Sequence, residues 1–148
     1  MAFAPQQHLS AIAMRIGALA LAGLLGAACA PLKPEAEPLK TGEQVYSETC
    51  AACHAGGVSG APRYQNESDW QKLLDEGQVI LSAHGWVGVR AMPPQGGNPA
   101  LSLEEFSRAV AYMGRAVGAG WQAPDAAMLE AIEREVVLRR EEMAEKTR

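Results

Sequence analysis

Bulky aromatic side chains, cysteines and histidines are all scarce in this sequence. Aromatic residues make up only 5% of its 148 residues, so a small domain built from it lacks the large side chains that usually fill a core. Cys29, Cys50 and Cys53 are too few for a disulfide framework. The net charge of −4 includes no basic block, which argues against nucleic acid as a partner. A bound cofactor would complete such a core.

The most informative stretch of the chain is Cys50-Ala51-Ala52-Cys53-His54. Two cysteines three residues apart, with a histidine directly after the second, are the signature of covalent attachment of c-type haem. On a helix these three side chains share one face, which can offer two thiols to the porphyrin vinyl groups and an imidazole to the iron. Cys-x-x-Cys pairs also bind zinc or carry out thiol redox chemistry, so the motif by itself leaves three hypotheses.

The zinc and thiol-redox hypotheses each need a further sequence feature that this chain does not show. A structural zinc site needs two more ligands, but the other histidines are His8 and His84 and no second Cys-x-x-Cys pair occurs. A thiol oxidoreductase would show the βαβ pattern, which the sequence lacks. Haem is therefore the favoured interpretation.

Residues 1–30 have the features of an export signal. Arg15 is the only charged residue, and the apolar run that follows is short for a helix that spans a bilayer. The stretch before Cys29 resembles a bacterial lipoprotein signal, although Gly26 stands where a large apolar residue is usual. We expect a lipid anchor at Cys29 rather than plain secretion or an uncleaved membrane anchor. All three alternatives place the domain outside the cytoplasm, on the periplasmic side of a bacterial membrane.

Residues 31–40 are rich in proline and are expected to form an extended tether, which at ~3.1 Å per residue would span roughly 30 Å. A domain is expected over residues 41–120. Thr41 and Gln44 form a capping box that predicts a helix running through the cysteine motif, and Ser102 and Glu105 predict a second helix to about Met113. A short amphipathic helix is expected over residues 70–76, stopped by a glycine.

Met92 is the best candidate for a second axial ligand of a haem iron. It lies in a loop stiffened by Pro93 and Pro94, which limit the freedom of the thioether. The other methionines belong to the leader, to the tail or to a helix where packing explains them. His84 is the rival ligand and is expected on a partly exposed helix face.

Residues 121–148 predict a long amphipathic helix capped by Asp125. Its apolar stripe is interrupted by Arg139 and Arg140, and is made of Met128, Leu129, Ile132, Val136 and Met143. The helix is either docked on the domain or solvated, and a sharper hypothesis makes it a partner-docking or dimerisation helix.

The stretch from Gly42 to Met113 resembles a class I c-type cytochrome, and more narrowly the bacterial cytochrome c5 group. The matching segments are Cys50–Ala55, Gly60–Arg63, Met92–Pro94, Gly96–Gly97 and Leu101–Met113. The resemblance implies an all-α fold around one covalently bound haem, with the first and last helices of the domain crossing, to which this chain adds a C-terminal helix. Some relatives carry a cysteine pair after the methionine loop; here that stretch holds no cysteine.

The resemblance also implies the roles of particular residues. Cys50 and Cys53 would hold the haem, His54 and Met92 would be the axial ligands of the iron, and Pro62 would offer its carbonyl to His54. Arg63 and Trp70 are tentative contacts of the haem propionates, with surface charge and core as their alternatives.

The expected function is electron transfer without substrate chemistry, so the protein is predicted not to be an enzyme. Its partners would be redox proteins such as a respiratory dehydrogenase, reductase or oxidase. Two alternatives stay open. One is a haem-based ligand-binding or sensory protein, and the other is a fixed cytochrome subunit of a respiratory complex.

Overall fold

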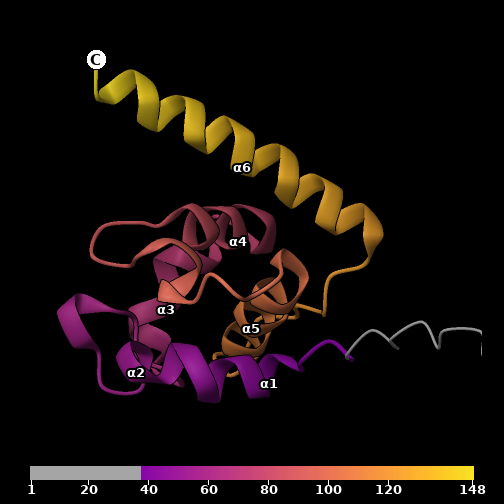
Figure 1. Ribbon diagram of the computed structural model, residues 1–148. Helices are drawn as coiled ribbons and strands as arrows, with labels where there is room; N and C mark the ends of the chain where they lie inside the picture. The colour runs from indigo at the N-terminus through magenta and orange to yellow at the C-terminus, as the bar shows by residue number, and fades with distance from the viewer. Residues whose placement is uncertain (1–37) are drawn as a thin grey trace, which may run out of the picture. The chain divides into compact units, whose positions relative to one another are not determined.

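The computed structural model describes residues 38–148 (Figure 1). The predicted export signal, the lipidation at Cys29 and most of the predicted tether lie outside these residues. The described part is helical, and its only strand-like pairing is the bridge between Val89 and Met92. Its elements are α1 (Gly42–Val45), η1 (Tyr46–Cys50), α2 (Ala51–His54), η2 (Val58–Gly60), α3 (Glu67–Leu74), α4 (Gln78–Val87), η3 (Pro94–Gly97), α5 (Leu103–Arg115) and α6 (Ala126–Lys146). The all-α prediction is confirmed.

A continuous helical path leads from Thr41 to the cysteine motif. The Thr41 side chain accepts from the backbone N–H of Gln44, and the Gln44 side chain accepts from that of Thr41, as the capping box predicts. Between α1 and α2, the segment η1 is π-helical, and its wider turn ends at Cys50. The predicted helix through the motif is therefore confirmed, with a π segment that the sequence pattern does not reveal.

The first helix crosses α5 at very close range, as predicted. A Cβ atom at Gly42 would lie 2.2 Å from the carbonyl oxygen of Arg108, so only glycine allows this approach. Beside the crossing, the rings of Tyr46 and Tyr112 pack with their centroids 5.6 Å apart. This crossing sets the position of the cysteine motif relative to α5.

Two helix boundaries differ from the predictions. The helix expected over residues 70–76 is α3, which begins earlier because the side chain of Asn66 caps it by accepting from the N–H of Asp69. The helix α5 continues through Gly114, where a stop was expected. A Cβ atom at Gly114 would lie 2.2 Å from the Trp121 ring, so this glycine permits close packing rather than ending the helix.

The long helix α6 packs against α4, as Figure 1 shows. Asp125 caps it as predicted, by accepting from the N–H of Met128. Ile132 is fully buried and Val136 is 5% exposed, and both belong to a cluster with Ala83 of α4. Met143, by contrast, is 40% exposed. The helix is therefore docked over its first half, and the apolar stripe does not continue as a buried surface to its end.

A second, larger cluster forms the main core of the domain. It joins the first helical path to α3 and α5 and consists of Val45, Tyr46, Cys50, Trp70, Leu101, Phe106, Ala109, Val110, Met113 and Val117.

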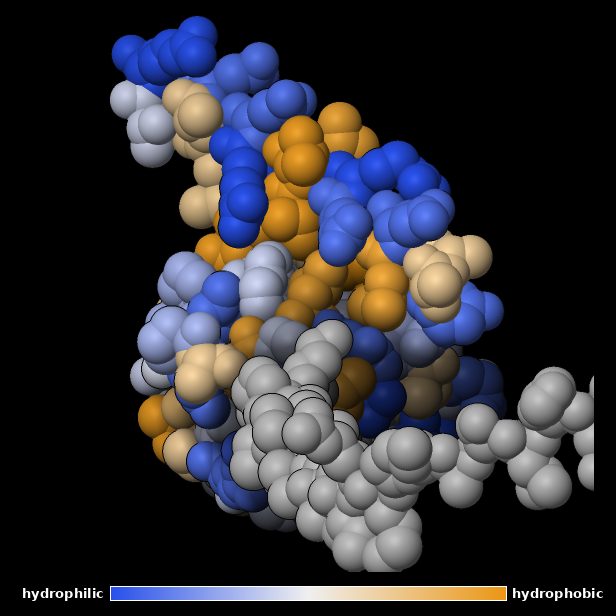
Figure 2. All heavy atoms as spheres, turned by 45° about the vertical axis from the view of Figure 1, so that its right-hand side comes forward, coloured by the Kyte–Doolittle hydropathy of each residue, from blue (hydrophilic) through white to orange (hydrophobic). Residues whose placement is uncertain are grey.

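Figure 2 shows hydrophobic residues gathered in the upper half of the molecule, next to the strongly hydrophilic end of the chain. Within residues 38–148, no helix is both long and apolar enough to cross a membrane.

Candidate functional site

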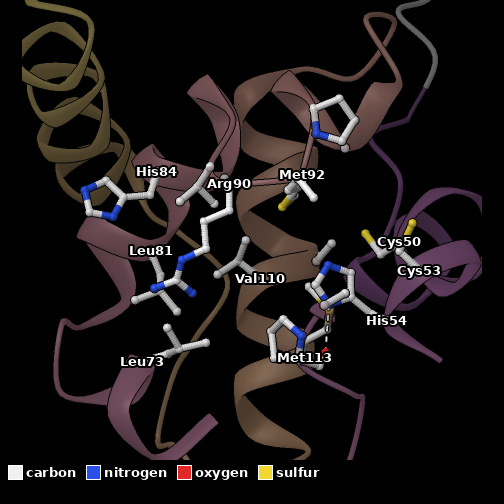
Figure 3. Close-up of a pocket in the computed structure, with 18 of the residues that line it drawn as sticks. Cys50, Cys53, His54, Leu73, Leu81, His84, Arg90, Met92, Val110 and Met113 are labelled. Atoms are coloured by element: carbon white, nitrogen blue, oxygen red, sulfur yellow. Dashed lines mark hydrogen bonds between the residues drawn. The ribbon is translucent and has the colours of Figure 1, made fainter. Parts of the chain in front are cut away.

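The cysteine motif lies at one end of a cavity of about 460 Å³ (Figure 3). The helix α5 supplies an apolar wall through Phe106, Ala109, Val110 and Met113, and the walls include residues of α3, α4 and the Met92 loop. At Gly85 on α4, a Cβ atom would lie 2.9 Å from the Phe106 ring, so this glycine keeps α4 close to α5. The result is an apolar space with the motif at one side.

Cys50 and Cys53 both line this cavity and are free thiols. Cys50 is buried, and burial raises the pKa of its thiol to about 11, whereas Cys53 is exposed. A thiol with such a raised pKa is a poor nucleophile and a poor ligand for a metal ion until it loses its proton. This applies to Cys50 alone, because Cys53 is exposed.

His54 is buried, and a backbone carbonyl orients its ring. Its Nδ1–H donates to the carbonyl of Pro62 at 2.8 Å, which leaves Nε2 as the ring atom available to a metal ion. The chain returns to His54 through a tight turn in which Gly57, Ser59 and Gly60 have positive φ angles of 78°, 52° and 79°. The glycine-rich composition of this turn thus serves to bring Pro62 back to the imidazole.

Met92 and His54 approach the cavity from different sides, and Figure 3 shows the space between them. Two backbone hydrogen bonds between Val89 and Met92, of 3.1 and 2.9 Å, close the turn that holds the methionine. A Cβ atom at Gly85 would lie 3.5 Å from the Met92 methyl carbon, so α4 also supports it. The structure therefore brings together the four residues predicted to hold a haem.

His84, the rival ligand, also lines the cavity but has a partner of its own. Its Nδ1 lies 3.3 Å from a carboxylate oxygen of Glu76, and the ring is partly exposed. In Figure 3 the ring points away from the space between His54 and Met92.

The structure places Trp70 in the wall of the cavity and Arg63 outside it. Trp70 is 3% exposed and lines the cavity, with its indole N–H donating to the Arg63 carbonyl at 2.8 Å. Arg63 is not among the cavity residues, because its guanidinium donates to both carboxylate oxygens of Asp69, at 2.7 and 3.0 Å. That pairing lowers the pKa of Asp69 to about 2. The propionate contacts of both residues stay predictions.

Sequence reasoning missed two arginines that line the cavity, Arg90 and Arg139. Arg139 comes from α6, three residues after the buried Val136, and so lies on the side of the helix that faces the domain. A charge inside an apolar stripe was the signal that could have identified it. Arg90 follows α4 with a positive φ of 55°.

The residues of the cavity fit a covalently attached haem. Two thiols lie at one side, an imidazole and a thioether border the same space, and α5 supplies an apolar wall. Across residues 38–148, no group of three or more His, Cys, Asp or Glu side chains lies together as a conventional metal site. A haem iron needs no such group, because the porphyrin supplies four of its ligands.

Comparison with known proteins gives a family match over residues 37–113. The matching family model is described as "Cytochrome C oxidase, cbb3-type, subunit III". Cytochrome c-555 of Prosthecochloris aestuarii is 37% identical over 83 residues, which cover 51% of this chain and 84% of that protein. Cytochrome c5 of Ectopseudomonas mendocina is 30% identical over 76 residues, which cover 50% of this chain and 87% of that protein.

A solved structure gives the same result for the fold. A chain of the structure described as "electron transfer complex of nitrite reductase with cytochrome c" matches with a TM-score of 0.50 and 39% identity. The match covers 93% of that chain and 51% of this one. The family match ends at residue 113, so α6 lies beyond it.

Proposed function

Because the chain belongs to the class I c-type cytochromes, which bind haem c covalently, we propose that it is a monohaem electron carrier between redox proteins. The observation that supports this most strongly is that Cys50, Cys53, His54 and Met92 border a single apolar cavity. In this proposal the protein performs no substrate chemistry of its own.

Each of the four residues has a distinct proposed role. Cys50 and Cys53 form the thioethers, and His54 offers Nε2 to the iron while Pro62 holds its Nδ1–H. Met92 offers its sulfur from the other side of the cavity. When bound, the haem supplies an iron that takes up and gives back one electron.

The surroundings of the site favour the reduced state. A thioether ligand and an apolar wall both disfavour the additional positive charge of ferric iron, so the reduction potential is expected to be high. With His54 and Met92 both bound to the iron, no position would be left for a substrate. These properties suit a carrier.

The partner is proposed to be a redox protein. The relative in the solved structure is crystallised in a complex with nitrite reductase, which is an example of such a partnership for that protein. Residues 1–30 have the features of an export signal, and we propose that the domain works on the periplasmic side of a bacterial membrane, held there by a lipid on Cys29. The intact mass of the exported protein would report haem addition, the cleavage site and the lipid together.

Replacing Met92 by leucine tests the axial ligand. Leucine keeps the volume of the side chain but removes the sulfur, so the ferric protein should lose its thioether-to-iron charge-transfer band and its potential should fall. The matched comparison is Met113→Leu, because Met113 also lines the cavity; this variant should keep the band. A wild-type protein without a low-spin c-type spectrum, or a Met92→Leu variant with the band intact, would contradict the proposal.

The description of the family model supports one alternative, a fixed cytochrome subunit of a respiratory complex. Purification from detergent-solubilised membranes separates the two. A carrier should be recovered by itself at moderate salt, whereas a fixed subunit should elute with the other subunits of its complex.

The ligand-binding alternative has a test of its own. A sensory haem protein needs an open or exchangeable axial position, so its ferrous form should bind carbon monoxide rapidly. The proposed carrier should not bind it at neutral pH while Met92 is intact.

A further inference from the structure

The helix α6 contributes a residue to the cavity although it lies beyond the family match. Arg139 lines the same space as Cys50 and His54. Its helix is held at this place by Ile132 and Val136, which are buried against α4. The tail therefore positions one guanidinium at the cavity.

The guanidinium of Arg139 is incompletely paired within the described residues. One terminal nitrogen donates to Glu142 at 3.0 Å, but Nε is buried and has no hydrogen-bond partner there. The side chain is only 21% exposed. A buried guanidinium N–H without an acceptor is costly, so the site is incomplete as the protein residues alone form it.

The charges around the cavity indicate what would complete it. Besides Arg139, the cavity is lined by the ionisable side chains of Arg90, His84 and Glu76. Glu76 lies beside His84. Figure 3 shows Arg90 and His84 across the cavity from Cys50 and Cys53. Arg139 comes from α6, which packs on α4, the helix that carries His84. Two guanidiniums thus line the cavity, and one nitrogen of Arg139 donates to Glu142.

The chemistry of haem c matches this arrangement. The vinyl groups that form the thioethers and the two carboxylates of the porphyrin lie on opposite sides of the macrocycle. Attachment at Cys50 and Cys53 would therefore direct the carboxylates away from the cysteines, toward the side of the cavity where Figure 3 shows Arg90. Arg63, the earlier candidate for this contact, is already paired with Asp69 and is not among the cavity residues.

We propose that α6 is part of the haem pocket and that Arg139 pairs with a haem carboxylate. This inference rests on the proposed haem site but not on electron transfer to any particular partner. A guanidinium that neutralises a carboxylate beside the iron disfavours the ferric state. Arg139 is therefore a positioning and charge-compensating residue that raises the reduction potential, supplied by a segment outside the family's common domain.

The test is a potentiometric titration of the haem-loaded, full-length protein. We expect Arg139→Gln to shift the ferric/ferrous equilibrium toward ferric by a few-fold to about tenfold, where tenfold corresponds to about 59 mV for one electron. Arg139→Lys keeps the charge and should restore most of the potential. Arg140→Gln removes the same charge from the exposed neighbouring position and should leave the potential close to that of the wild type.

The outcomes separate this inference from the proposed function. If Arg139→Gln and Arg140→Gln have equal potentials while both show a normal c-type spectrum, the inference fails and the carrier proposal stands. If the wild-type protein lacks covalent haem, the proposed function itself fails. Thermal unfolding of each variant shows whether α6 is still docked. Loss of packing, unlike loss of charge, would lower the unfolding midpoint of Arg139→Lys as well as that of Arg139→Gln.

Discussion

A single hydrogen bond decides which nitrogen of His54 is available. Because the Pro62 carbonyl can only accept, Nδ1 must carry the proton and Nε2 must be the free ring atom. A carbonyl partner also makes the imidazole a stronger electron donor. Proline suits this position, since its restricted φ helps to hold the carbonyl at the end of the glycine-rich turn.

Most of the site could be predicted at this scale because its signals are local. The spacing of Cys50, Cys53 and His54 places three side chains on one face of a helix, whatever the remainder of the chain does. The prolines after Met92 indicate a stiff loop for the same reason. Arg63 shows the limit of local reasoning, because its neighbour Asp69 competes for the guanidinium and the sequence does not say which contact prevails.

The ion pair of Arg63 and Asp69 makes the stability of the domain depend on pH. Arg63 lowers the pKa of Asp69 from its ordinary value of 3.8 to about 2, so the folded state binds the proton less readily than the unfolded state. The stability contributed by this pair is complete above about pH 4 and is lost as the pH falls through about 2. Asp69→Asn should remove that part of the pH dependence.

The measurement for this pair is the free energy of unfolding by denaturant, at neutral pH and at several values down to pH 2. Wild type should lose more stability than Asp69→Asn over the acidic range. Equal slopes for the two proteins would contradict the assignment.

At the scale of elements, the crossing of α1 and α5 depends on Gly42. A methyl group there would overlap the Arg108 carbonyl at 2.2 Å, so the helices must separate or bend. We expect Gly42→Ala to destabilise the domain by about 1–3 kcal/mol, as overpacking usually does. Denaturant unfolding of the haem-loaded protein measures this.

Gly56 is the matched control for that substitution. An added Cβ atom would meet no atom within 4 Å, and the φ angle of Gly56 is not positive. Gly56→Ala should therefore change stability by less than about 0.5 kcal/mol. Equal stabilities of Gly42→Ala and Gly56→Ala would show that α1 and α5 are not in such close contact.

The capping boxes made the beginnings of α1 and α5 predictable, while helix ends and irregular turns were harder to predict. A cap is a contact between residues three positions apart, so its sequence pattern is sufficient. The π segment η1 and the continuation of α5 through Gly114 depend on distant packing, in the second case on Trp121. The sequence contains these partners without indicating that they meet.

At the scale of the molecule, α6 is expected to unfold together with the cytochrome domain. Ile132 is fully buried in the cluster between α6 and α4. Ile132→Ala should cost about 2–5 kcal/mol and lower the single unfolding midpoint of the whole protein. Thermal unfolding followed by both helix and haem signals tests this.

Val137 is the control from the same helix. It is 53% exposed, so Val137→Ala should change stability by less than about 0.5 kcal/mol. Two separate transitions in the wild type, with Ile132→Ala affecting only the smaller one, would show instead that α6 is an independent appendage.

The residues proposed to bind the haem can be predicted from short stretches of the sequence. The cysteine motif, the capping boxes and the proline-stiffened Met92 loop act over a few residues, so their geometry follows from local rules of the backbone. The docking of α6 on α4, which brings Arg139 to the cavity, could be seen only in the folded chain. That contact joins residues far apart in the chain, and it depends on how apolar faces pack in three dimensions, which periodicity along the sequence does not specify.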